Sequence, residues 1–435
     1  MKSKHYVIIG NGVAGIEAAM TIRQRFAPEH ARITVISKES DYFFSRTALM
    51  YAYMNLMQRQ DLEPHERSFY PRQRIELLRD EVLDLDANTH TLHLAQHGDL
   101  AYDKLLIAAG AKPRSIPFEG LERVTDGVVH FVSMQDLDHC EHLTPSTKRA
   151  VVVGGGLIGI ELVECLLHHD VEVTFLVRES SYWPQALSHD EGTRIAELIR
   201  QHKVDLRLEE ELQTIHTDAQ GRVEAISTNK GERIEAQMLG LCIGVVANVD
   251  WLKEATTPPK IERSLCVDQS FATDLPDVYG AGDCVQIATS SSADPIVETI
   301  WYSAKRHGRL AALSMMGDPI AYAPPLFFNS SKFFDVEYTT VGEIVRAPPH
   351  ARALWRTHPD KPYLTQRITY DPLQEDRVLG FNMLGSRWNH RILEEWILER
   401  RSIAHVKKRL HTAQFDVEFG RAKLKAMREE EIDTP

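Results

Sequence analysis

Two glycine-rich turns constrain this chain more than any other feature. Each has the pattern Gly-x-Gly-x-x-Gly, follows a short run of β-branched residues and leads directly into a helical pattern. The glycines are Gly10, Gly12 and Gly15 in the first turn and Gly154, Gly156 and Gly159 in the second. The first glycine of such a turn permits the sharp bend, the second admits a pyrophosphate close to the backbone, and the third lets helix and strand pack closely. The phosphates then lie at a helix N-terminus, where the dipole favours negative charge.

The glycine pattern is stronger evidence for nucleotide binding because it occurs twice. A single Gly-x-Gly-x-x-Gly is as often a plain glycine turn as a nucleotide site. Because the chain places the pattern between a strand and a helix twice, we predict two nucleotide-binding units. They would bind two dinucleotides, or one dinucleotide and one hydride donor.

The composition is that of a multidomain globular protein. With 435 residues the chain is too long for one core. A net charge of −12 argues against nucleic-acid binding and, more weakly, against an anionic membrane surface. No apolar run is long enough to span a bilayer, and the first strand begins too early for a signal peptide. The five cysteines and twenty histidines show no metal-ligand spacing, so we predict no metal site and unreactive thiols in a reducing cytoplasm.

The pattern of the chain changes after residue 324, from alternating strands and helices to several strands followed by a helix. The strands are expected at residues 336–341, 363–370 and 378–383. One long helix is expected at 390–409, and the charged tail at 419–435 is predicted to be a solvated helix. Near the N-terminus, residues 75–86 are expected to form a pair of strands.

The end of the second predicted strand, residues 33–37, supplies a candidate ribose contact. An acidic side chain at this place commonly accepts hydrogen bonds from ribose hydroxyls. Ser37 stands at the strand end, Lys38 follows, and Glu39 lies two residues beyond the strand. We favour Glu39 as the ribose ligand; a solvated loop glutamate is the equal alternative.

Four motifs in sequence order give the chain its resemblance to a known family. They are the first glycine turn, the strand end Ala108-Ala109-Gly110, the second glycine turn with Glu161, and the segment Gly280-Ala281-Gly282-Asp283. Together they resemble the flavoprotein reductases with two dinucleotide-binding domains, the pyridine nucleotide-disulfide oxidoreductase family. The resemblance implies an α/β fold of two Rossmann-like domains, with the NAD(P)H domain inserted in the FAD domain, and a C-terminal α+β interface domain. The implied boundaries are 1–125 and 256–323 for the FAD domain, 126–255 for the NAD(P)H domain and 324–435 for the interface domain.

The same resemblance implies roles for individual residues. Asp283 matches the aspartate that holds the flavin ribityl chain, and a carboxylate is able to accept hydrogen bonds from its hydroxyls. Trp301 lies in the segment 298–308, which resembles the helix over the flavin pyrimidine end; packing of Trp301 against the first helix is the alternative. The predicted cofactor-binding residues are Gly10, Gly12, Val13, Ala14, Gly15, Ser37, Lys38, Glu39, Arg46, Val82, Ala108, Ala109, Gly110, Gly154, Gly156, Leu157, Ile158, Gly159, Arg178, Glu179, Gly244, Gly282, Asp283 and Trp301.

A missing thiol indicates the branch of the family. Disulfide reductases of this group carry redox cysteines after the second strand, whereas residues 40–60 contain none. The stretch resembles instead an arginine-containing segment of ferredoxin, rubredoxin and nitrite reductase flavoproteins and of apoptosis-inducing-factor-like proteins, with Arg46 matching the arginine. Tyr51 falls where those relatives place a lysine that pairs with the glutamate represented here by Glu161. We therefore predict Tyr51 and Glu161 as catalytic positions whose ion pair is lost, which leaves Glu161 to contact the nicotinamide carboxamide or to serve only as a helix residue.

The strand end after the second glycine turn selects between NADH and NADPH. An acidic residue there binds both ribose hydroxyls, and an arginine attracts a 2′-phosphate. Val177 stands where NADH enzymes usually place the acid, and Arg178 and Glu179 follow it. Arginine has the forked donors that suit a phosphate. We lean towards NADPH or dual use; an arginine held in a loop salt bridge is the alternative.

These features predict an FAD-dependent NAD(P)H oxidoreductase. Hydride would pass from the nicotinamide to the flavin, and electrons would then pass to an acceptor that is not a disulfide: an iron–sulfur or rubredoxin-type carrier, a quinone, oxygen or a small substrate. The alternative is an NAD(P)H-responsive redox sensor with slow turnover. A homodimer through the C-terminal domain is possible under either hypothesis.

Overall fold

The computed structural model describes residues 3–288, 294–344, 347–416 and 424–433, which fold into two compact units. Each unit is assembled from three stretches of the chain. The first unit comprises Met1–Ile116, His130–His142 and Gly244–Ala323, and the second comprises Pro117–Val129, Leu143–Ile243 and Pro324–Pro435. The predicted domain boundaries stay predictions; the compact units group residues 130–142 and 244–255 with the first unit.

The first unit is built on a parallel sheet with strand order β19-β7-β1-β2-β3. Its strands are β1 (Lys4–Ile9), β2 (Ala31–Ser37), β3 (Ile75–Arg79), β7 (Lys104–Ile107) and β19 (Val278–Gly280). Val7 and Ile8 in the central strand are fully buried, because both faces of the sheet are covered. The remaining strands form the antiparallel set β4 (Val82–Asp86), β5 (Thr91–Leu94) and β6 (Gly98–Ala101), and the pairs β8 (Ala111–Pro113) with β17 (Val245–Ala247) and β18 (Leu265–Val267) with β20 (Val285–Ile287).

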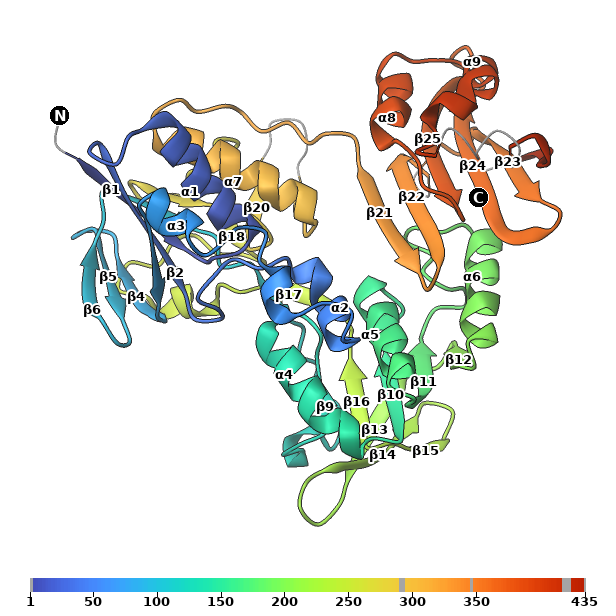
Figure 1. Cartoon of the computed structure of the whole chain (residues 1–435), viewed down its shortest axis with the longest axis horizontal. Helices are drawn as coiled ribbons and strands as arrows, with labels where there is room; N and C mark the ends of the chain where they lie inside the picture. Colours follow the sequence, from blue (N-terminus) through green and yellow to red (C-terminus); the bar gives the residue numbers. More distant parts are fainter. Residues whose placement is uncertain (1–2, 289–293, 345–346, 417–423, 434–435) are drawn as a thin grey trace. The chain divides into compact units, whose positions relative to one another are not determined.

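Two helices of the first unit, α1 and α7, lie side by side (Figure 1). Gly308 of α7 lies so close to α1 that a Cβ atom would be 2.1 Å from the carbonyl oxygen of Ala14. A glycine at this point therefore sets the distance between the two helices. The helices of this unit are α1 (Val13–Arg25), α2 (Leu49–Tyr53), α3 (Phe69–Arg72), α7 (Trp301–Met315) and most of α4 (Met134–Leu143).

The second unit contains a second parallel sheet, with strand order β12-β11-β10-β16-β9. The sheet consists of β9 (Val128–Val129), β10 (Arg149–Val153), β11 (Glu172–Val177), β12 (Asp205–Leu208) and β16 (Met238–Leu241). The helices are α5 (Leu157–His168) and α6 (His189–Gln201), and a small antiparallel sheet contains β13 (Leu212–Thr217), β14 (Val223–Thr228) and β15 (Arg233–Glu235). The two parallel sheets and the strand–glycine–helix order at β1 and β10 confirm the predicted α/β, Rossmann-like class.

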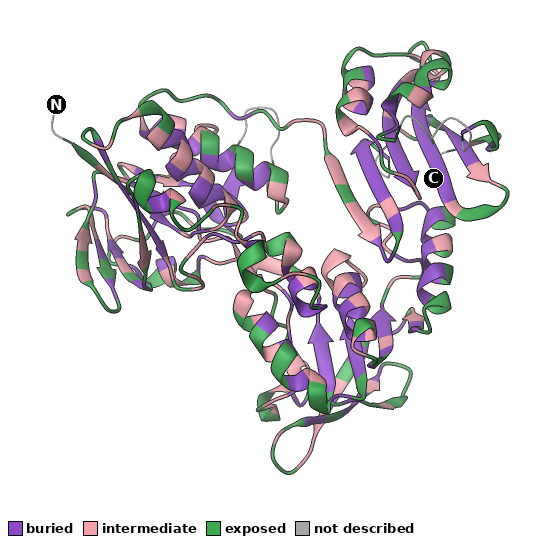
Figure 2. Cartoon of the chain, in the orientation of Figure 1, coloured by how far each residue is buried: buried purple, intermediate pink, exposed green. Residues whose placement is uncertain are grey.

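The second unit also carries a six-stranded antiparallel sheet, ordered β21-β22-β25-β24-β23-β26. Its elements are β21 (Phe328–Phe333), β22 (Val336–Gly342), β23 (Arg352–His358), β24 (Lys361–Asp371), β25 (Arg377–Leu384) and β26 (Arg428–Asp433), with helices α8 (His390–Leu398) and α9 (Ile403–Arg409). Figure 2 shows β22, β24 and β25 buried along most of their length. One face is apolar, where Phe381 packs with Trp396 of α8 and Val406 of α9. The other is polar, where Asn382 donates to the buried Glu191 of α6 over 3.1 Å.

Three local predictions in these regions need correction. Residues 390–409 form two helices and not one, because Arg400 takes a left-handed φ of 54° and Ser402 begins a new helix as its N-cap. The charged tail, predicted as a helix, is helical at residues 424–425 but forms the edge strand β26, paired with β23, over Arg428–Asp433. Residues 419–423 and 434–435 of that prediction lie outside the described residues. The segment 75–86 does contain two strands, but they belong to different sheets.

The close approach of α7 to α1 predicts the effect of Gly308→Ala. The added methyl group meets a backbone oxygen, which has little freedom to move. Overpacking of this kind costs about 1–3 kcal/mol of stability, and we expect the upper end because the contact is with backbone. Replacing glycine by alanine in a helix gains about 1 kcal/mol in helix propensity, which is less than this cost. We expect a lower free energy of unfolding in denaturant titrations. Ser314→Ala, a small change at a buried position of the same helix, is the control and should be close to neutral.

Candidate functional site

The first glycine turn has two closed positions and one open position. Gly10 has a φ of 109°, and a Cβ on it would lie 2.1 Å from the carbonyl oxygen of Ala108. A Cβ on Gly15 would lie 1.9 Å from the oxygen of Gly10. Around Gly12, in contrast, no protein atom lies within 4 Å of the Cβ position. The first and third glycines are therefore required by packing, whereas the second leaves open space at the α1 N-terminus.

The second turn repeats this geometry in the second unit. A Cβ on Gly154, whose φ is 112°, would lie 2.3 Å from the oxygen of Cys242. A Cβ on Gly159 would lie 2.0 Å from the oxygen of Gly154, and Gly156 again has open space around it. The N-cap residues Gly12 and Gly156 provide no side-chain cap for α1 or α5. Each helix thus leaves N–H groups for an anionic ligand, beside a glycine that admits it.

Two polar side chains, Asn11 and Asp283, fit a ligand rich in hydroxyl groups. The Oδ1 atom of Asn11 is buried and has no hydrogen-bond partner among the described residues. Asp283 follows Gly282, whose φ is 81°, and burial raises the pKa of its carboxyl to about 6 although Arg46 and His307 oppose the shift. A carboxylate that burial destabilises gains from external donors. These groups fit the FAD site that the sequence predicts, with Asp283 as the residue that would hold the ribityl hydroxyls.

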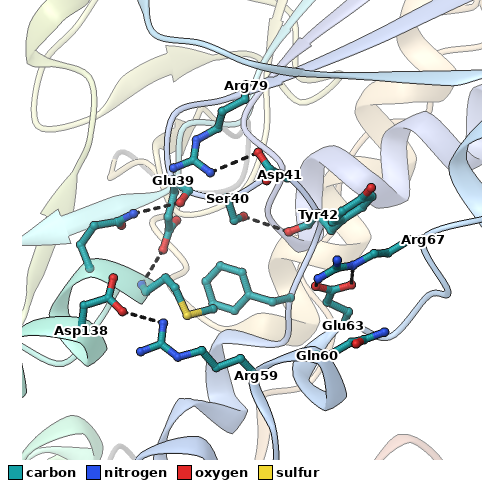
Figure 3. Close-up of a pocket in the computed structure, with 13 residues that line it drawn as sticks. Glu39, Ser40, Asp41, Tyr42, Arg59, Gln60, Glu63, Arg67, Arg79 and Asp138 are labelled. Atoms are coloured by element: carbon teal, nitrogen blue, oxygen red, sulfur yellow. Dashed lines mark hydrogen bonds and ion pairs between the residues drawn. The ribbon is translucent and has the colours of Figure 1, made fainter. Parts of the chain in front are cut away.

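Glu39 lies in a network that joins the strand end to α4 (Figure 3). Its carboxylate accepts two hydrogen bonds from Arg46, at 2.8 and 2.6 Å, and one from the backbone N–H of Met134 at 3.1 Å. Ser37 accepts from the Glu39 N–H, and Lys38 pairs with Glu81 over 2.7 Å. The structure thus brings the predicted Glu39 and Arg46 together. A ribose contact by Glu39 stays a prediction, and it would have to share the carboxylate with Arg46.

Figure 3 also shows the pocket that Glu39 lines. Its charged side chains are mutually paired: Arg79 with Asp41, Arg67 with Glu63, and Arg59 with Asp138. Because each arginine already faces a carboxylate, the pocket offers no uncompensated charge to a further ligand.

Glu161 lies on α5, part-buried and close to a second glutamate. Burial, together with Glu164 one turn away, raises the pKa of Glu161 to about 7, and Lys332 opposes the shift. Lys332, on β21, pairs with Glu164 over 2.8 Å. This lysine was missed in the sequence, since nothing local links a strand of the C-terminal region to α5. Tyr51, the other predicted catalytic position, is a part-buried residue of α2 in the other unit.

Arg178 and Glu179 form an ion pair directly after β11. The Nε atom of Arg178 lies 3.0 Å from Oε1 of Glu179, and 71% of the arginine side chain is exposed. In the structure Arg178 is therefore a loop arginine held in a salt bridge, which was the alternative to a role in binding a 2′-phosphate. Nucleotide selection by this pair stays a prediction.

The other predicted residues occupy ends of strands and helices. Trp301 is the first residue of α7, part-buried, with Lys305 Nζ 5.5 Å from its ring centre. Val82 is a buried residue at the start of β4, and Gly244 precedes β17 with a φ of 95°. The rest are Val13 and Ala14 in the first turn of α1, Leu157 and Ile158 in the first turn of α5, and Ala108, Ala109 and Gly110 after β7.

The comparisons with known proteins place the chain in a family. Residues 4–308 match the model of the pyridine nucleotide-disulphide oxidoreductase family, to which the chain therefore belongs. It is 26% identical over 425 residues to the NADH oxidase of Methanocaldococcus jannaschii, a match covering 92% of this chain and 91% of that protein. It is 24% identical over 330 residues to the rubredoxin-NAD(+) reductase of Ectopseudomonas oleovorans, covering 75% and 84%. The reductase in the covalent putidaredoxin reductase–putidaredoxin complex has the same fold, with a TM-score of 0.79 at 20% identity, covering 92% of this chain and 94% of that one.

Membership of this family confirms the predicted class of enzyme and its cofactors. The chain is an oxidoreductase that uses FAD and a pyridine nucleotide. Bound FAD would supply the hydride-transfer and electron-transfer chemistry. The protein's own contribution would be the pair of open glycine turns, the helix N-termini that their N-cap glycines leave without a side-chain cap, and the carboxylate of Asp283. Within the described part of the chain, no helix is long and apolar enough to cross a membrane.

The pKa of Glu161 predicts a pH-dependent stability. This pKa rises from an ordinary value of 4.5 in the unfolded chain to about 7 in the folded one. Between these values the folded state keeps a proton that the unfolded state has lost, so stability falls as pH rises through the window. Glu161→Gln has no ionisable carboxyl and therefore escapes this loss of stability. The melting temperature of Glu161→Gln minus that of wild type should increase from pH 5 to pH 8 in thermal scans.

The control for that experiment is Glu172→Gln, which changes a 79% exposed glutamate paired with Arg149. The difference in melting temperature between Glu172→Gln and wild type should not change over the same pH range. A melting-temperature difference for Glu161→Gln that is equally independent of pH would contradict the raised pKa of Glu161.

Proposed function

We propose that this enzyme moves electrons from NAD(P)H to a small iron–sulfur or rubredoxin-type carrier protein, and not to a disulfide. The observation that supports this is the placement of the cysteines. Residues 40–60 contain none, four of the five cysteines are buried, and the fifth, Cys266, is part-buried. A disulfide acceptor needs an accessible, low-pKa thiol to exchange with, and burial raises the pKa of both Cys266 and Cys284.

Similarity to carrier-protein reductases adds support for this acceptor class. Rubredoxin, terpredoxin and rhodocoxin reductases are among the relatives, at 24–27% identity over about three quarters of this chain. Oxygen is the second candidate acceptor, since the NADH oxidase relative matches the chain nearly from end to end. A cytoplasmic location and a homodimer formed through the C-terminal domain stay predictions.

Each unit would bind one of the two dinucleotides. In the first unit, the open turn at Gly12 and the N-terminus of α1 would hold the FAD pyrophosphate, and Asp283 would hold the ribityl chain. In the second, the turn at Gly156 and the N-terminus of α5 would hold the nicotinamide dinucleotide. Glu161, whose pKa is raised to about 7, would donate a hydrogen bond to a polar group of the nucleotide when it is protonated.

Steady-state turnover with purified holoenzyme tests the acceptor. We expect NAD(P)H oxidation to be fastest with a rubredoxin or a ferredoxin, slower with oxygen, and absent with oxidised glutathione. Turnover with glutathione disulfide, or with oxygen alone at the carrier rate, would contradict the proposal. A single slow reduction with no turnover on any acceptor would favour the redox sensor instead.

Nucleotide selection gives a separate prediction for Arg178. If its guanidinium binds the 2′-phosphate, Arg178→Ala removes a charge-assisted hydrogen bond and weakens NADPH binding about tenfold or more. NADH binding should change little. Arg123→Ala is a matched control, since this arginine is 70% exposed and pairs through Nε with its neighbour Glu122 over 3.2 Å. Equal losses for NADH and NADPH, measured by quenching of protein fluorescence, would refute the assignment.

A further inference from the structure

Three side chains converge on one carboxylate just ahead of α7. Ser303 donates to Glu298 over 3.0 Å, His307 Nε2 lies 3.2 Å from the same carboxylate, and the hydroxyl of Tyr322 donates to it. A carboxylate is only able to accept, so Nε2 of His307 carries the proton. Burial alone would raise the pKa of Glu298, but the hydrogen bonds from His307 and Tyr322 hold it below its ordinary value. Glu298 is thus an ionised group with three neighbouring donors.

The network ties together segments on either side of α7. Glu298 precedes the helix, Ser303 and His307 lie one turn apart on it, and Tyr322 follows it. His307 is fully buried, with its ring 4.9 Å from Tyr322 and 5.1 Å from Phe271. Tyr322 is itself anchored, because its N–H donates to the Gln269 carbonyl over 2.8 Å. The start of α7 is therefore fixed to the core of the first unit.

The carboxylate is close to the helix start but does not cap it. The N-cap of α7 is Ile300, which provides no side-chain acceptor. The hydrogen bonds that Glu298 accepts from Ser303, His307 and Tyr322 come from side chains and not from backbone N–H groups of the first turn. An uncapped N-terminus carries partial positive charge and is stabilised by a nearby negative group.

The network also reaches the candidate FAD contact. His307 is, with Arg46, one of the two charged neighbours that oppose the rise in the pKa of the Asp283 carboxyl. The Nδ1 atom of His307 is buried and has no hydrogen-bond partner in the described part of the chain. Gly308, the next residue, is the point where α7 contacts α1 next to the first glycine turn. The same turn of α7 thus touches the network on one side and the FAD-binding elements on the other.

We propose that Glu298, His307 and Tyr322 form a positioning network that holds the start of α7 against the bound FAD and so sets the affinity for the flavin and its reduction potential. The reduced flavin carries more negative charge than the oxidised one, so a helix N-terminus held beside it would stabilise the reduced form more. Loosening the network weakens FAD binding and makes the midpoint potential more negative. This inference rests on the FAD assignment and not on the identity of the electron acceptor.

Conservative variants test the network. Tyr322→Phe removes one hydroxyl, His307→Leu removes the ring donor, and His307→Gln restores a donor of similar reach. Their FAD dissociation constants are measured by flavin fluorescence during reconstitution of the apoprotein, and their midpoint potentials by equilibration with a reference dye. We expect Tyr322→Phe and His307→Leu to bind FAD several-fold more weakly, and His307→Gln to return towards wild type. Each tenfold loss in preference for the reduced flavin lowers the potential by about 30 mV.

The control is Tyr102→Phe. Tyr102 is a buried tyrosine of the same hydrophobic core, and its hydroxyl has no hydrogen-bond partner among the described residues. This variant should keep the wild-type affinity and potential. The proposal fails if Tyr322→Phe and His307→Leu behave like Tyr102→Phe, or if His307→Gln binds FAD no better than His307→Leu. A wild-type protein that takes up no FAD would overturn the cofactor assignment, and the network role with it; a failure confined to carrier turnover would touch only the proposed acceptor.

Discussion

At each glycine turn, a helix begins within van der Waals contact of a neighbouring strand's backbone, and this close approach organises both units. A side chain on Gly10 would overlap the carbonyl of Ala108, and one on Gly154 would overlap that of Cys242. Because the first and third glycines allow this contact, each helix N-terminus is held at the edge of a parallel sheet with its N–H groups uncapped. The open glycine between them then gives a phosphate access to those groups. The dinucleotide sites are thus a consequence of backbone packing rather than of particular side chains.

Carboxylates with raised pKa values are the second feature that the two units share. Burial raises the pKa of both Asp283 and Glu161, and the neighbouring charges differ. Arg46 and His307 oppose the rise at Asp283, whose carboxylate would gain donors from a ligand. Glu161 is raised further by Glu164, whose own charge is neutralised by Lys332. Carboxylates that depend on partners for their charge state are typical of functional sites.

The sequence was most informative where structure is local. The strand, turn and helix around each glycine motif depend on contiguous residues, and the fold class, family and cofactors predicted from them are confirmed. Contacts between distant segments were not predictable. The pair of Lys332 with Glu164 links β21 to α5, and β26 is held by ion pairs from Glu429 to Arg356 and Lys407. A charged tail has no periodicity that distinguishes a solvated helix from such an edge strand. The individual site roles, including those of Tyr51 and Glu39, stay predictions.

The central claim is that one chain binds FAD and a pyridine nucleotide at two separate turns and moves hydride between them. An anaerobic visible-absorbance titration of the purified protein, with NADH and NADPH added separately, tests it most directly. The account predicts a yellow protein whose flavin band is bleached by a near-stoichiometric amount of at least one nucleotide. A colourless protein that takes up no FAD, or a flavin that neither nucleotide reduces, would contradict the account.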